Sequence, residues 1–123
     1  MNMIDSHMHL GLADVDLPAI LRRMDENGIE MSWLLTWEET DPPLKHLYIP
    51  LPPEPILEAH AKYPGRFIPF YAPDPTDPEA GKRITQSVQR GIRGCGELKV
   101  SIRWEDPVIE QYLEVVQSHR LPL

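Results

Sequence analysis

Two histidines separated by one residue lie close to the start of the chain, in the sequence Asp5-Ser6-His7-Met8-His9. They follow directly on a short apolar segment that is typical of a β-strand. Side chains at positions i and i+2 of a strand point to the same face, so both imidazoles can converge on one cation. Neutral imidazole is a good ligand for divalent Zn, Fe or Ni. His7 and His9 therefore predict a metal site, and the alternative is a pair of surface or capping histidines in a strand-to-loop turn.

The strands and helices that must position His7 and His9 alternate regularly along the chain. Apolar runs rich in β-formers predict strands at residues 3–6, 29–36, 66–71 and 92–100. Helical patterns are expected at residues 17–27, 55–63 and 78–90, and from Pro107 onward. Asp16, Asp77-Pro78 and Asp106-Pro107 are typical helix starts. This alternation predicts an α/β fold with a parallel sheet and right-handed crossovers.

The length of each strand–helix unit points to one architecture. Four units in 123 residues are about 30 residues each, and eight such units make the roughly 250 residues of a (β/α)8 barrel. Leu121-Pro122-Leu123 follows the last helix and is expected to begin a fifth strand. We therefore expect residues 1–123 to form a single truncated domain, the N-terminal half of a TIM barrel.

Three segments, taken together and in order, resemble the amidohydrolase superfamily and in particular its amidohydrolase-related branch. Residues 4–10 (IDSHMHL) resemble the superfamily's first strand, and residues 63–70 (YPGRFIPF) resemble the third-strand segment of the branch. Residues 91–99 (GIRGCGELK) resemble its Gly-rich fourth strand, which ends in an acidic residue. The resemblance extends over the whole chain and implies a metal-dependent barrel enzyme.

This resemblance implies a ligand set. His7 and His9 would be metal ligands, and Glu97 would lie at the end of the fourth strand, where the superfamily often places a ligand that can bridge two metals. Some members use a carbamylated lysine in that region, and Lys99 is the only lysine near it. Strand alternation puts Cys95, Glu97 and Lys99 on one face, so spacing does not separate Glu97 from Lys99. We prefer Glu97, because a carboxylate needs no modification to bind a cation; an ion pair with a neighbouring Arg or Lys is its alternative role.

The implied reaction is hydrolysis of an amide, ester or lactone bond of a small molecule by a metal-activated water. The divalent metal is expected to be Zn, with Mn, Fe or Ni as alternatives. Decarboxylation is also known in this branch and is the alternative activity. The later ligands and the catalytic aspartate of the family pattern belong to strands five to eight, so we expect the isolated chain to be inactive and we assign it no catalytic residue.

Residues 37–53 are expected to form a long loop after the second expected strand, and loops of this length are often functional. We expect this loop to overhang the metal end of the sheet. Trp37 and His46 of the loop, together with Arg103 and Trp104 after the fourth strand, are candidate substrate-binding residues. The alternative is that all four are rim and packing residues.

Composition and charge exclude several classes of partner. The net charge is −7 and the 12 Lys and Arg residues are scattered, so nucleic acid and anionic membranes are not expected partners. No segment has the about 20 apolar residues of a membrane helix. The single cysteine, Cys95, forms no internal disulfide, and with no signal peptide a cytoplasmic location is expected.

A half-barrel leaves strand edges open. We expect a homo-oligomer or a complementing C-terminal half to cover them. A catalytically inactive half-barrel that serves as a subunit or binding module is the second hypothesis of function.

Overall fold

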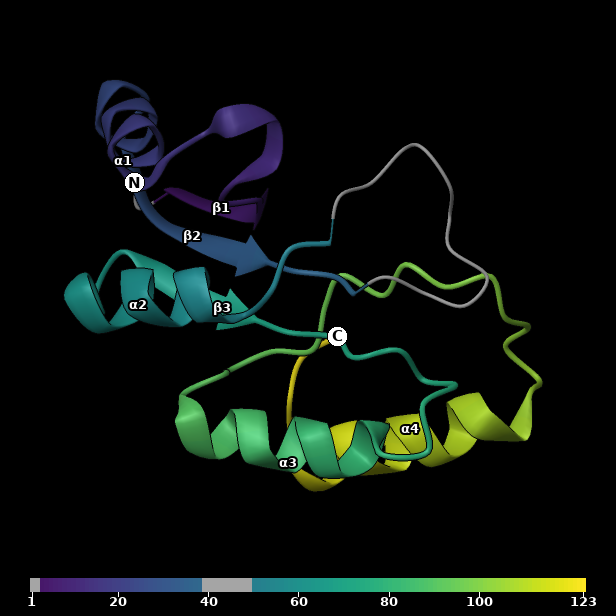
Figure 1. Ribbon diagram of the computed structural model, residues 1–123. Coiled ribbons are helices and arrows are strands. Elements are labelled where there is room, and N and C mark those ends of the chain that lie inside the picture. Colours follow the sequence, from purple (N-terminus) through teal and green to yellow (C-terminus); the bar gives the residue numbers. More distant parts are fainter. Residues whose placement is uncertain (1–2, 39–49) are drawn as a thin grey trace.

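The computed structural model describes residues 3–38 and 50–123 (Figure 1). The three strands are β1 (Met3–Met8), β2 (Ile29–Leu35) and β3 (Phe67–Phe70). The helices are a short 3-10 turn η1 (Leu12–Asp14), α1 (Leu17–Glu26), α2 (Glu54–Lys62), α3 (Ala80–Arg90) and α4 (Pro107–Ser118). The strands form one parallel sheet in the order β1-β2-β3, which confirms the predicted parallel α/β class. Among the described residues, no helix is long and apolar enough to cross a membrane.

Two of the predicted helix starts are confirmed by their capping bonds. The carboxylate of Asp16 accepts a hydrogen bond from the backbone N–H of Ala19 at 2.8 Å, and that of Asp106 accepts one from Val108 at 3.0 Å. The predicted start of the third helix is wrong by two residues, because α3 begins at Ala80. The carboxylate of Asp77 accepts from the N–H of Glu79 at 2.9 Å, which forms a turn before the helix.

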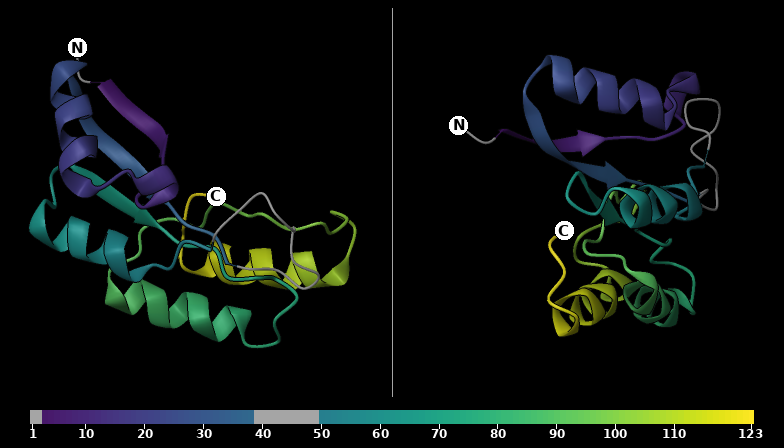
Figure 2. Two further views of the ribbon diagram at one scale, coloured as in Figure 1. Left: turned by 45° about the horizontal axis from the view of Figure 1, so that its top comes forward. Right: turned by 90° about the vertical axis from the view of Figure 1, so that its left-hand side faces the viewer.

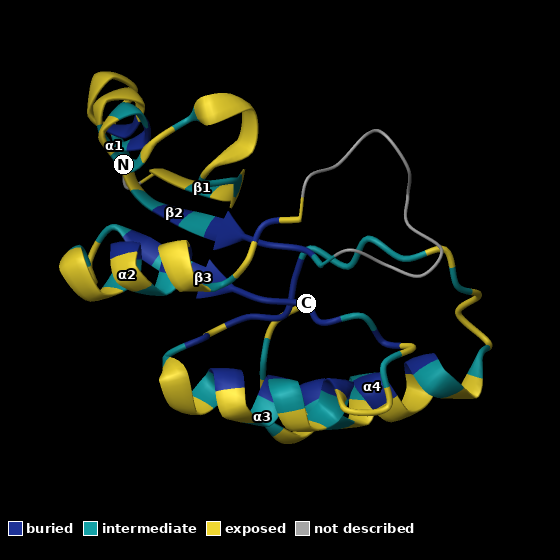
Figure 3. Ribbon diagram, in the orientation of Figure 1, coloured by how far each residue is buried: buried dark blue, intermediate teal, exposed yellow. Residues whose placement is uncertain are grey.

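Helices α1 and α2 cover the same face of the sheet. Leu34 of β2 and Phe67 of β3 point to this face and are fully buried. They pack in one core with Ile20 and Met24 of α1 and Ile56 and Ala59 of α2 (Figure 3). On the opposite face, the rings of Trp33 and Phe70 are stacked with their centroids 4.7 Å apart. The sheet therefore has one helix-covered face and a second face available for the site.

A second core joins α3 and α4, which lie side by side in each view (Figures 1 and 2). It contains Ala72, Ala80, Ile84, Cys95, Tyr112 and Val116. Cys95 is fully buried, with its Sγ 3.1 Å from the hydroxyl oxygen of Tyr112. Cys95 is therefore a small residue of this core.

The segment expected to form the fourth strand is not a regular strand. It makes one parallel bridge to β3, between Phe70 and Gly94, supported by a 3.0 Å hydrogen bond from the N–H of Tyr71 to the carbonyl of Gly94. Three residues later, the N–H of Glu97 donates to the carbonyl of Thr36 at 2.7 Å. The physical reason lies in the absence of a side chain at Gly94, which lets the backbone lie directly against the Phe70 ring and leave the β3 edge. The segment thus crosses from β3 to the end of β2.

Residues 121–123, expected to begin a fifth strand, make one backbone hydrogen bond to the segment expected to form the fourth strand. The carbonyl of Pro122 accepts a hydrogen bond from the N–H of Cys95 at 2.8 Å. Residues 121–123 are not part of a β-ladder with any described segment. The described residues therefore form a three-stranded parallel sheet, and a barrel remains a proposal.

Candidate metal centre

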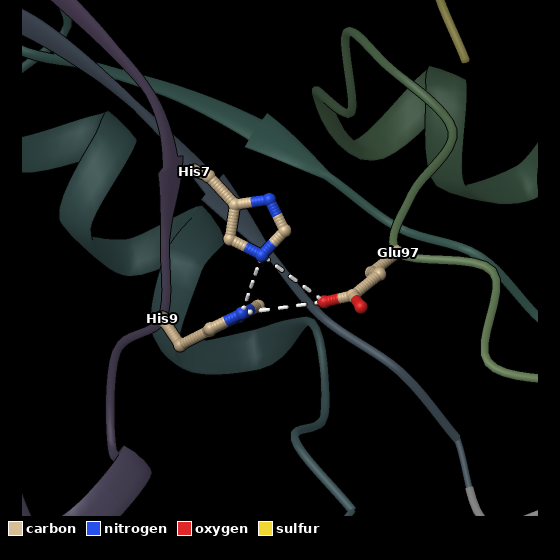
Figure 4. A group of neighbouring side chains, drawn as sticks. All are labelled: His7, His9 and Glu97. Carbon is tan, nitrogen blue, oxygen red and sulfur yellow. Dashed lines mark hydrogen bonds and ion pairs between the residues drawn. The ribbon is translucent and has the colours of Figure 1, made fainter.

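Strand β1 brings His7 and His9 to the same side of the sheet. Met8, between them, packs into the core beneath α1 and α2, so the two histidines point to the opposite face. Their Nε2 atoms are 3.1 Å apart (Figure 4). The predicted convergence of the two imidazoles is therefore present.

Glu97 reaches the two histidines from the irregular segment after β3. Its backbone is held at the end of β2 by the hydrogen bond to Thr36, and its side chain points toward β1 (Figure 4). The Oε2 atom lies 3.3 Å from Nε2 of His7 and 3.3 Å from Nε2 of His9. The two histidine nitrogens and this oxygen, which lies 88 residues after His9 in the sequence, thus form a nearly equilateral triangle of potential ligand atoms.

The triangle fits a divalent cation in size. The point equidistant from the three atoms lies about 1.9 Å from each, slightly less than the roughly 2.0–2.2 Å of Zn–N and Zn–O bonds. The spacing of His7, His9 and Glu97 would therefore allow all three side chains to hold one divalent cation. Oε2 of Glu97 is buried and accepts no hydrogen bond from a described residue. Acceptor atoms so close together repel one another unless a proton or cation lies among them, so the donor set suits a metal.

His9 is prepared to act as a ligand. Its Nδ1 donates a hydrogen bond to the carbonyl oxygen of Leu35 at 2.9 Å, which leaves the lone pair of Nε2 facing the centre. Burial lowers the pKa of His9 below its usual value, and this effect exceeds the opposing effects of the Leu35 hydrogen bond and the Glu97 charge. The imidazole is therefore neutral near pH 7, which is the form that binds metals.

The ion pair considered as the alternative role of Glu97 is present at one carboxylate oxygen, and the other oxygen is placed where the predicted ligand role requires it. Oε2 faces the histidines, whereas Oε1 accepts a hydrogen bond from Nζ of Lys99 at 2.6 Å. The structure brings the Glu97 carboxylate to the histidines, and Nζ of Lys99 donates a hydrogen bond to that carboxylate. Asp5 lies outside the triangle, and its carboxylate accepts a hydrogen bond from the N–H of His7 at 2.9 Å.

The four candidate substrate-binding residues are placed very differently. Trp37 is buried beside His9, with ring centroids 4.7 Å apart and an interplanar angle of 79°. The side chain of Arg103 is 90% exposed. Trp104 is 70% exposed and borders an apolar hollow of about 260 Å³ next to Leu98 and Leu123. His46 lies outside the described residues, and among the three described candidates Trp37 adjoins the centre.

Sequence reasoning missed a polar cluster that forms around Glu38, directly after β2. The carboxylate of Glu38 accepts hydrogen bonds from the hydroxyl of Tyr71, from the backbone N–H of Asp74 and from the guanidinium of Arg83. Burial raises the pKa of Tyr71, so its hydroxyl stays protonated and donates. The cluster borders a hollow of about 510 Å³ and ties the end of β2 to α3. No sequence signal could have found it, because its members are far apart in sequence and each is common on protein surfaces.

No family model matches this sequence, and no curated protein matches it. Three solved structures resemble the fold. A probable 2-pyrone-4,6-dicarboxylic acid hydrolase from Acinetobacter baumannii with citric acid bound has a TM-score of 0.64 and 18% identity, over 98% of this chain and 48% of that chain. A 2,6-dihydroxybenzoate decarboxylase complexed with 2,6-dihydroxybenzoate has a TM-score of 0.62 and 18% identity, with the same two coverages.

The third structure is a 5-carboxyvanillate decarboxylase from Sphingomonas paucimobilis, with a TM-score of 0.61 and 17% identity over 98% of this chain and 50% of that chain. All three are members of the amidohydrolase superfamily. At this level of identity the similarity concerns the fold. The chain spans about half the length of each of these structures.

Proposed function

We propose that this chain is the metal-binding half of a metal-dependent hydrolase of the amidohydrolase superfamily. The observation that carries the proposal is the triangle of ligand atoms formed by His7, His9 and Glu97. The similarity of the fold to three members of that superfamily supports it. The ion is Zn, with Mn, Fe or Ni as alternatives, and the substrate is a small molecule with an amide, ester or lactone bond.

A divalent cation supplies activation of water and polarisation of the bond to be cleaved. The chain's own residues prepare the place where this happens. The Leu35 carbonyl fixes the tautomer and orientation of His9, and the Thr36 carbonyl fixes the backbone of Glu97. Trp37 covers one side of His9 and excludes solvent there.

Three protein ligands leave the coordination of a divalent cation incomplete. The structures that this fold resembles are about twice as long, so further ligands and the proton-transfer group would come from a complementing half. The isolated chain is therefore expected to bind metal weakly and to have no turnover.

Equilibrium dialysis against Zn²⁺, followed by metal analysis, tests the proposal. Wild type should hold up to one equivalent with low affinity, and His7→Ala and His9→Ala should lose it. His119→Ala is the matched control, because His119 lies at the end of α4 and contacts Thr85. Equal binding by all four proteins would contradict the proposal, and tightly held, stoichiometric zinc would contradict the incompleteness of the site.

Decarboxylation is a second candidate activity, because two of the three similar structures are decarboxylases. Release of CO₂ from an aromatic acid by the chain reconstituted with a complementing half would favour it over hydrolysis. An inactive binding module is the third candidate. It is favoured by the exposed Met3 and Ile4 at the edge of β1, and persistent inactivity of every reconstituted form would support it.

A further inference from the structure

The two oxygens of Glu97 have different surroundings. Oε2 is directed to the two histidines and accepts no hydrogen bond from a described residue. Oε1 accepts a short, charge-assisted bond from Nζ of Lys99 at 2.6 Å. Only one carboxylate oxygen is thus offered to a cation in the triangle.

Lys99 is itself held in place. Its Nζ lies 4.6 Å from the centroid of the Trp37 ring, in cation–π geometry, and its side chain is only 15% exposed. The Trp37 ring also packs edge to face against His9. A series of contacts therefore runs from Glu97 through Lys99 and Trp37 to His9.

We propose that Lys99 is a positioning residue that sets the metal selectivity of the site. This inference rests on the proposed function, because it requires that His7, His9 and Glu97 bind a cation. With Oε1 occupied by an ammonium, Glu97 gives a single oxygen, and the site consists of two imidazole nitrogens and one oxygen. Borderline cations such as Co²⁺ and Zn²⁺ accept such a set, whereas hard cations need more oxygen ligands.

The positive charge of Lys99 also favours cations such as Co²⁺ and Zn²⁺ over hard cations. The ammonium of Lys99 balances the charge of the Glu97 carboxylate, so the site offers less negative charge to a cation. Hard cations depend on the negative charge of their ligands more than imidazole-binding cations do. The role also differs from that of a carbamylated lysine, because the amine of Lys99 acts as a hydrogen-bond donor to Glu97 instead of contacting the cation.

Binding of Co²⁺ and Mn²⁺ to the full 123-residue chain tests the inference. Co²⁺ is followed by its visible absorption and Mn²⁺ by the electron paramagnetic resonance of the free ion. In Lys99→Met, the freed Oε1 becomes available, so the ratio of the Mn²⁺ to the Co²⁺ dissociation constant should fall about tenfold. Lys99→Arg keeps a cationic donor and should keep the wild-type ratio. Lys82→Met is the control, because Lys82 is an exposed residue of α3 paired with Glu79.

An unchanged ratio in Lys99→Met, or equal weakening of both metals, would overturn the inference, and circular dichroism verifies that each variant is folded. Co²⁺ affinity that rises with added bicarbonate would also overturn it, because it would mean that Lys99 acts as a carbamate. His7→Ala separates the two proposals. If His7→Ala binds Co²⁺ as well as wild type, the metal centre itself is wrong; if only the Lys99→Met ratio fails to change, the centre stands and the selectivity role is wrong.

Discussion

The backbone of Gly94 lies against the Phe70 ring, and we predict that Gly94→Ala destabilises the fold and displaces Glu97 from the histidines. An ideal Cβ at this position would lie 2.1 Å from Cε1 and 2.3 Å from Cδ1 of Phe70. The ring has no room to move away, because Phe70 is 2% exposed and is stacked on Trp33. The strain must therefore move the segment that carries Glu97.

The structure gives the scale of the effect. Two carbon atoms in contact are about 3.5–4.0 Å apart, so the backbone at residue 94 must shift by about 1.5 Å. Overpacking a core in this way costs about 1–3 kcal/mol, and occasionally more. The shift also strains the hydrogen bonds that join Gly94 to Tyr71 and Arg93 to Pro69. We expect the free energy of unfolding to fall by about 2–4 kcal/mol, which for a chain of this size lowers Tm by roughly 8–15 °C.

Urea unfolding followed by tryptophan fluorescence measures this change, with Co²⁺ binding as the second readout. Gly65→Ala is the matched control, because no atom lies within 4 Å of a Cβ built there. The double variant Gly94→Ala/Phe70→Ala should be more stable than the sum of the single effects predicts, since the alanine at position 70 removes the clash. A Gly94→Ala chain within about 0.5 kcal/mol of wild type, or strict additivity in the double variant, would refute this reasoning.

Glu38→Gln should lower the free energy of unfolding by about 1.5–3 kcal/mol, because it removes the charged acceptor of Arg83. Thermal unfolding measures this loss, with Glu105→Gln as the control, and equal Tm values for the two variants would contradict the prediction. Burial raises the pKa of the Cys95 thiol to about 11, so iodoacetamide at pH 8 should modify it only in the unfolded chain, and rapid modification of the native chain would contradict its burial. Because this pKa is raised in the folded state, its contribution to stability is complete below about pH 9 and is lost as the pH rises through about 11. The exposed side chains of Ile4 and Trp104 are apolar surface that a second copy of the chain would bury, so we expect at least a dimer. Sedimentation equilibrium at micromolar concentration measures this, and a compact monomer would contradict the prediction.

Local patterns in the sequence predicted those parts of the fold that depend on neighbouring residues. The two-residue period of His7 and His9 places both imidazoles on one face of β1, and the caps at Asp16 and Asp106 depend on residues two or three positions away. Three of the four expected strands are present within a few residues of their predicted ends. These features are set by geometry within one element, which sequence periodicity reports directly.

Features that depend on contacts between distant segments were not predictable in the same way. Periodicity at residues 92–100 suggested a regular strand, but the approach of Gly94 to Phe70 and the bond from Glu97 to Thr36 decide the actual path. The choice between Glu97 and Lys99 was open in the sequence, because strand alternation put both on one face. It depends on which side chain reaches β1, and this is a property of the tertiary structure.

Anomalous X-ray diffraction at the zinc absorption edge, from crystals of the wild-type chain soaked in Zn²⁺, tests the central claim most directly. We predict one anomalous peak within about 2.2 Å of Nε2 of His7, Nε2 of His9 and Oε2 of Glu97, and its loss in crystals of Glu97→Gln. A wild-type crystal at saturating zinc with no peak at this triangle, or with its peak bound elsewhere on the chain, would contradict the assignment of a metal centre.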